Sequence, residues 1–73
     1  MNKLIIDVAN EKIYLMIITD LSIYNITHQN TKSNYEKLTI IINDFFSSKN
    51  IKIDDINTIY INNGSGSFAG IRN

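Results

Sequence analysis

The sequence contains no cysteine, no proline and no tryptophan, and it has only three glycines. Without cysteine the chain can form neither a disulfide framework nor a thiolate metal site. No apolar run approaches about 18 residues, so the sequence predicts no transmembrane helix. Asp7 interrupts the first apolar stretch too early for the core of a signal peptide. We therefore expect a cytoplasmic protein with no membrane partner.

An excess of charge of one sign is also missing, because seven Lys and Arg residues balance seven Asp and Glu residues. A neutral chain has no basic field to hold a nucleic acid by itself. It also has no net charge to oppose self-association. The 73 residues make one small domain or a piece of one. A domain of that size buries only roughly 60% of its unfolded surface and is marginally stable without partners.

The first part of the chain predicts three strands in an antiparallel meander. Residues 3–8 form an alternating β-branched run, residues 12–19 are apolar on both faces, and residues 22–27 are mixed, as in an edge strand. A strand that is apolar on both faces is usually covered on both, so we expect cover on each side of residues 12–19.

The period then changes to that of an amphipathic helix over residues 34–46. Thr31 and Ser33 are candidate caps, and Ser33 with Glu36 fits a capping box. Ile40 falls off the expected core face. Ordinary packing explains such a face, and the alternative is that Ile40 and its neighbours meet a partner helix. The expected core face consists of Tyr35, Leu38, Ile41, Ile42, Phe45 and Phe46.

A second β pattern follows the helix. Residues 53–56 predict a short turn or helical loop, and residues 57–62 a buried strand. The order strand, helix, strand requires a crossover connection, which places strand 57–62 parallel to one of the earlier strands. The sequence therefore predicts a single α/β domain with the order β-β-β-α-β.

All three glycines lie in the closing stretch NNGSGSFAGIRN, residues 62–73. One interpretation is a structural turn that leads into a helix capped by Ser67, because glycine permits positive φ. A second is a dinucleotide loop, since residues 64–69 fit G-x-G-x-x-[GA] after a strand. That fingerprint normally follows the first strand and needs an acidic residue about 20 positions later, for which no chain remains. A Walker A loop is excluded because no Lys-Ser/Thr follows the glycines.

The third interpretation is a family-specific recognition loop, because the stretch resembles the TsaB family (YeaZ/Gcp-like). The family loop reads roughly G-P-G-S-F-T-G-x-R, and this chain has GSGSFAGIR. The opening IIDVA, residues 5–9, is similar to the family's first strand, whereas Asn34 stands where a histidine is common. Ser65 replaces the usual proline and Ala69 the usual threonine. The matching loop residues are Gly64, Gly66, Ser67, Phe68, Gly70 and Arg72.

The resemblance implies an actin-like, ribonuclease-H-like ATPase fold. Residues 1–73 would be the N-terminal part of a TsaB/Gcp-like domain, incomplete at the start of a second helix that Ser67 opens. Such proteins are non-catalytic subunits that dimerise with a TsaD-like catalytic subunit. That enzyme makes N6-threonylcarbamoyladenosine at position 37 of tRNA. The residues expected at the partner interface are Leu38, Ile40, Ile41 and Phe45.

Further partners that the resemblance allows are a TsaE-like ATPase and a second copy of the chain, with tRNA reached only indirectly. It assigns no cofactor and no metal to this chain, although the complex uses ATP. In active relatives of the fold a carboxylate at the position of Asp7 faces nucleotide phosphates and metal. A vestigial contact of that kind is one interpretation of Asp7, and a polar strand end bonded to nearby backbone is the simpler one.

The main functional alternative is a piece of a catalytically active, ATP-dependent actin-fold enzyme, TsaD-like or a kinase. TsaD would be expected to carry a metal-binding histidine pair, whereas this chain has His28 alone, most simply a surface residue. Nothing in the sequence places a serine, His28 and an aspartate together, so a catalytic triad is not predicted. A reading frame without function is a third alternative.

Overall fold

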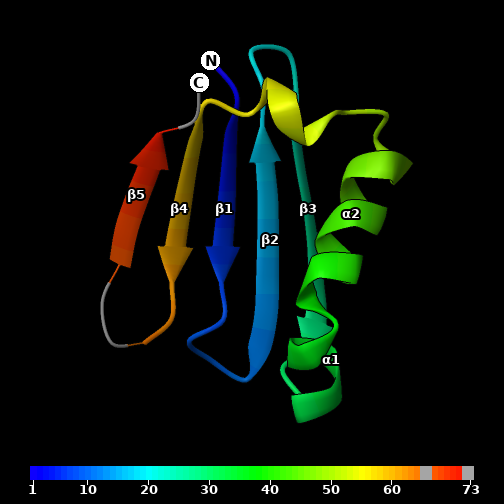
Figure 1. The fold of residues 1–73 in the computed structure, drawn as a ribbon, viewed down its shortest axis with the longest axis vertical. Coiled ribbons are helices and arrows are strands. Elements are labelled where there is room, and N and C mark those ends of the chain that lie inside the picture. Colours follow the sequence, from blue (N-terminus) through cyan, green and yellow to red (C-terminus); the bar gives the residue numbers. More distant parts are fainter. Residues whose placement is uncertain (65–66, 72–73) are drawn as a thin grey trace.

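The structure, a computed structural model, describes residues 1–64 and the backbone of residues 67–71. One sheet carries the helices on one face (Figure 1). Within the described residues, no helix is long and apolar enough to cross a membrane. The elements are β1 (Lys3–Asp7), β2 (Lys12–Ile18), β3 (Ile23–Gln29), α1 (Lys32–Glu36), α2 (Leu38–Ser48), the 3-10 turn η1 (Ile53–Asp55), β4 (Thr58–Asn62) and β5 (Ser67–Ile71).

The sheet has five strands in the order β3-β2-β1-β4-β5. β1, β2 and β3 pair antiparallel in sequence order, which confirms the meander and places β3 at an edge. β4 pairs parallel with β1 on the other side, with Asp7 opposite Asn62. The connection through the helices is therefore the crossover that the sequence predicts, and β1 becomes a central strand.

The core lies between one face of the sheet and α2. Leu15 and Ile17 of β2 stand opposite Ile6 and Leu4 of β1, because side chains in register share a face. The rings of Phe45 and Phe46 close this layer from α2 and meet edge to face, with centroids 6.4 Å apart. The fully buried cluster consists of Leu4, Ile6, Ile13, Leu15, Ile17, Phe45, Phe46 and Ile56.

The second face of the sheet carries a group of apolar side chains among polar ones and is not covered by any described helix. This corrects the expectation that residues 12–19 are covered on both sides and that strand 57–62 is buried. Tyr60 of β4 is 42% exposed and Ile23 of β3 is 63% exposed. Both α-helices belong to the single connection between β3 and β4, and α2 packs on the first face, so only that face gains cover. The apolar residues of this open face are Ile5, Tyr14, Met16, Ile18, Ile23 and Tyr60.

The helical segment starts and ends two residues beyond the predicted range 34–46, and it is interrupted at Lys37. Lys37 has φ −97° and ψ 13°, and its N–H is shared between two carbonyls of the preceding turn. α1 has no buried residue. α2 is held against the sheet by its two buried residues, Phe45 and Phe46. Tyr35, expected in the core, is 54% exposed.

Hydrogen bonds from neighbouring residues define both ends of the helical segment. Thr31 is the N-cap of α1, since its hydroxyl accepts from the backbone N–H of Asn34 at 3.1 Å. The capping box of Ser33 with Glu36 is wrong, because Ser33 lies inside the helix. At the other end Asn50 has φ 56°, and the N–H of Ile51 bonds back to the carbonyl of Phe46. This is a Schellman ending, in which asparagine is the usual substitute for glycine at the left-handed position.

The largest correction concerns Ser67, which opens strand β5 and not a second helix. β5 pairs antiparallel with β4 over five residues, from Ser67 opposite Asn62 to Ile71 opposite Thr58. Pairing along the open edge of β4 satisfies backbone groups on both strands. Gly64, with φ +89°, lies in the connection that makes the reversal.

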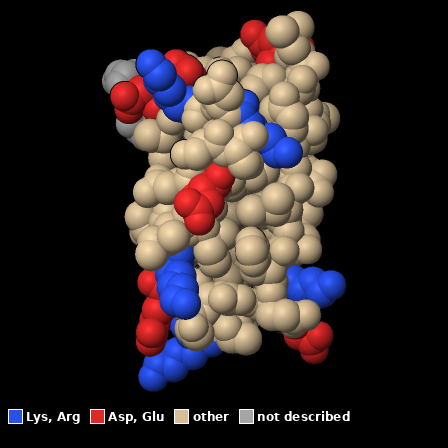
Figure 2. Space-filling model, turned by 90° about the vertical axis from the view of Figure 1, so that its right-hand side faces the viewer, with Lys and Arg blue, Asp and Glu red and all other residues tan. Residues whose placement is uncertain are grey.

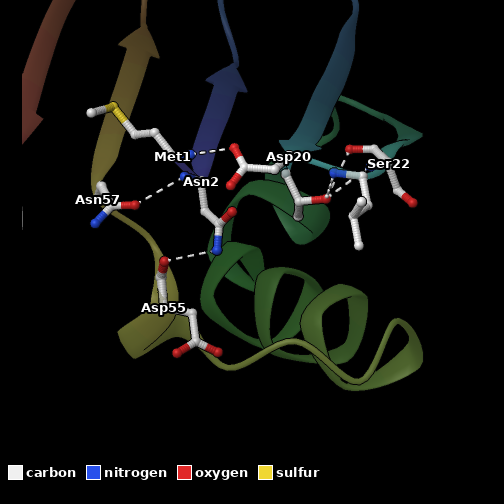
Figure 3. A network of polar contacts seen from close by, with 8 residues as sticks. Met1, Asn2, Asp20, Ser22, Asp55 and Asn57 are labelled. Atoms are coloured by element: carbon white, nitrogen blue, oxygen red, sulfur yellow. Dashed lines mark hydrogen bonds and ion pairs between the residues drawn. The ribbon is translucent and has the colours of Figure 1, made fainter.

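A polar network fixes the start of β1 (Figure 3). The amino group of Met1 forms an ion pair with Asp20 in the β2–β3 turn. The backbone N–H of Asn2 donates to the side chain of Asn57 at 2.9 Å, and its side chain donates to the carbonyl of Asp55 at 3.1 Å. One end of the central strand is thus tied both to its antiparallel neighbour and to the segment that enters β4.

Candidate functional site: the carboxyl ends of β1 and β4 and the exposed side of α2

The carboxyl ends of β1 and β4 meet because the two strands are parallel. Asp7 ends β1 and Asn62 ends β4, in direct register. The Asp7 Oδ1 atom accepts from the backbone N–H of Ala9 at 3.0 Å, and Asn62 Nδ2 donates to Oδ2 at 3.5 Å. Asp7 is therefore a polar strand end bonded to nearby backbone, as the simpler interpretation held. A contact of Asp7 with phosphate or metal stays a prediction.

The glycine loop begins directly beside this carboxylate. The backbone N–H of Gly64 donates to Asn62 Oδ1 at 3.2 Å, and Val8 N–H donates to the carbonyl of Asn62 at 2.9 Å. A Cβ at position 64 would lie 3.6 Å from the Cβ of Ala9, an ordinary contact. The positive φ of Gly64, and not lack of space, is therefore what favours glycine here.

The other residues of the motif loop are described less fully. Ser65, Gly66 and Arg72 lie outside the described residues. For Ser67, Phe68 and Gly70 the strand backbone of β5 is described. The recognition role predicted for this loop therefore stays a prediction.

A hollow of about 740 Å³ adjoins the end of β1 and is lined by Ala9, Asn10, Glu11 and Lys12. Four consecutive residues of one turn line it, so it is an open surface above the β1–β2 turn. Asn30 braces that turn, since its side chain donates to the carbonyls of Val8 and Asn10 at 3.0 and 2.9 Å. Among the described residues, no three His, Cys, Asp or Glu side chains gather to hold a metal ion.

The four residues expected at a partner interface differ in exposure. Ile40 is 59% exposed, while Phe45 is 2% exposed and belongs to the core. Leu38 and Ile41 are half-buried and pack against the core from its rim. Ile40 is thus the member of the set that offers a large apolar surface, and the interface itself stays a prediction.

A groove that the sequence did not reveal runs between β3 and α2. It encloses about 230 Å³ and is lined by Ile26, His28, Ile41, Asp44, Phe45 and Ser48. β3 and α2 contain one carboxylate, Asp44, and one histidine, His28, and no lysine or arginine. Figure 2 views the molecule from this side: charged groups gather toward the upper and lower ends, and an acidic group stands between them on a surface that is otherwise largely uncharged. Asp44, the one charged residue of α2, was the only hint of this groove in the sequence. The helix pattern alone does not show that Asp44 lies beside β3.

The groove brings together a histidine, an aspartate and a serine, but not as a catalytic triad. Ser48 Oγ donates to the carbonyl of Phe45 at 2.7 Å, within the last turn of α2. Over the described part of the chain, no hydrogen bond joins the side chains of His28, Asp44 and Ser48 to one another. His28 lies at the surface, as predicted.

Comparison with known proteins supports the fold. No family model matches the chain, and no curated protein matches it by sequence. Its structure is similar to that of YeaZ from Pseudomonas aeruginosa, with a TM-score of 0.72 over 82% of this chain and 10% sequence identity. The chain has the actin-like, ribonuclease-H-like fold. The match to YeaZ confirms the fold that the TsaB resemblance predicted, apart from β5. The chain spans 28% of the length of that neighbour, and identity this low shows the fold alone.

Proposed function

We propose that this chain is a non-catalytic, cytoplasmic binding subunit. It supports the formation of N6-threonylcarbamoyladenosine at position 37 of tRNA by dimerising with a TsaD-like enzyme. The likeness of its fold to YeaZ carries the proposal. The loop resemblance and the exposed Ile40 on α2 add to it.

The chemistry of the described residues agrees with a binding role. Asp7 is the one carboxylate at the ends of the parallel strands, and amide groups occupy both of its oxygens. The net charge of zero agrees with a chain that reaches tRNA through its partner.

The direct test is binding of the purified chain to the TsaD-like enzyme of the same cells, measured by calorimetry with and without ATP. We expect ATP-independent binding. Ile40→Asp should weaken it at least tenfold, because a charge on an exposed apolar contact must be desolvated on binding. Leu21→Asp is the matched control, since Leu21 is 95% exposed in the β2–β3 turn and lies on another element. Equal loss in both variants, or no binding by the wild type, would overturn the proposal.

A second candidate is an ATP-dependent enzyme of the same fold. The observation in its favour is the position of Asp7 where two parallel strands end, beside the start of a glycine loop. It predicts that the chain binds ATP and that Asp7→Asn abolishes this binding. Absence of ATP binding by the folded wild type would remove this candidate.

A further inference from the structure

The groove between β3 and α2 has the size and the lining to hold one side chain. Its floor is made by Ile26, Ile41 and Phe45, and its polar groups stand on the rim. Pockets for small molecules span about 300–1,000 Å³. At about 230 Å³ this hollow is smaller than that range. It is therefore better suited to one large apolar side chain of a protein partner than to a free ligand.

The charge on the rim restricts what that partner can present. Asp44 is exposed, and no ion pair or hydrogen bond of its side chain is found among the described residues. It is the only full charge on the two elements that form the groove. Lys49, which follows α2, places its ammonium over the ring of Tyr24 of β3, 5.2 Å from the centroid, and not in an ion pair with Asp44. An exposed carboxylate without an ion pair favours a cationic neighbour on a partner and disfavours an acidic one.

We infer that this groove binds a segment of the partner that carries a large apolar side chain next to a lysine or arginine. The apolar side chain enters the groove and the cation pairs with Asp44. The inference rests on the proposed function and deepens it, because it names the chemistry of the segment that docks beside Ile40. Ile40 lies four residues before Asp44 on α2, so the exposed side chain of Ile40 and the rim of the groove share one side of the helix.

The test fills the groove without touching the core. Ser48 is exposed on the rim, so Ser48→Leu should occupy the hollow and weaken binding to the TsaD-like enzyme at least tenfold. Ser47→Leu is the matched control: Ser47 is exposed, lies one position away and does not line the groove. Its binding should stay within about twofold of wild type. Thermal unfolding of both variants checks that they fold.

A second variant tests the charge independently. Asp44→Lys should weaken binding about tenfold, and Asp44→Asn should weaken it a few-fold while flattening the dependence of the association rate on salt. Glu11→Gln removes an exposed carboxylate from the β1–β2 turn and should change neither quantity.

The outcomes separate the two proposals. If the wild type does not bind the enzyme, the proposed function fails and this inference fails with it. If the wild type binds but Ser48→Leu and Asp44→Lys bind equally well, only the groove is wrong. If sedimentation shows a dimer of the chain that Ser48→Leu abolishes, the occupant is a second copy and the inference is overturned.

Discussion

Asn30 stabilises the turn between β1 and β2 through its side chain and its backbone. Its side chain donates to the carbonyls of Val8 and Asn10, and its backbone N–H donates to the carbonyl of Glu11. The residue directly after β3 thus supplies hydrogen-bond donors to carbonyl groups of the β1–β2 turn. This turn lies next to the end of β1, where Asp7 is.

We predict that Asn30→Ala lowers the free energy of unfolding by about 2 kcal/mol, because two hydrogen bonds worth about 1 kcal/mol each are lost. Urea unfolding measures the change. Gln29→Ala, an exposed neighbour at the end of β3, should stay within about 0.5 kcal/mol of wild type. Similar losses for the two variants would show that the bridge of Asn30 contributes nothing specific.

At the scale of elements, α1 depends on its cap, because none of its residues is buried. Thr31→Ala should lower the free energy of unfolding by about 1 kcal/mol, since the N–H of Asn34 loses its acceptor. Ser33→Ala should cost nothing measurable, because Ser33 lies inside the helix. Urea unfolding compares the two variants, and the reverse order would contradict the observed start of α1.

Periodicity predicted most of the elements, because burial on one face governs β1, β2, β3 and α2. The predictions failed where a helix interruption, strand pairing or the packing of distant elements outweighs the local pattern. The pattern of Tyr35 continues that of α2, yet the interruption at Lys37 turns it to solvent. Ser67 looked like a helix cap, but an open sheet edge lay within reach of the chain that follows it. The groove beside Asp44 depends on how α2 packs against β3, and no local pattern encodes that packing.

The position of β5 is directly testable by nuclear magnetic resonance. Pairing with β4 predicts cross-strand proton contacts between Tyr60 and Ala69 and slow amide exchange along their shared edge. A helix opened by Ser67 would instead show contacts between residues three and four apart within 67–71. Observation of that second pattern would contradict the five-stranded sheet.

At the scale of the whole molecule, an open face with a group of exposed apolar side chains combines with a net charge of zero. Exposed apolar patches on a neutral protein favour association, because nothing repels a second copy. We predict that the chain associates as its concentration rises and that Ile23→Lys, on the open face, reduces this association. Sedimentation velocity over a range of concentrations measures it.

Leu21→Lys provides the control for this prediction. It adds the same charge at a residue that is 95% exposed in the β2–β3 turn, off the face of the sheet. If both lysines reduce association equally, net charge alone is responsible and the open face has no part in it. The stability of both variants should stay close to that of wild type, since neither position belongs to the core.

The parallel pairing of β1 with β4 also has a consequence for biosynthesis. The strands join residues 55 positions apart in sequence, such as Asp7 and Asn62. At about 5–20 residues per second, a ribosome needs several seconds to add the segment between them. For the part of that time after β3 has been made, the meander lacks β4, and β1, later a central strand, is an unprotected apolar edge. A nascent chain at this stage would be a substrate for chaperones that bind extended apolar segments, and the arrival of β4 would release it.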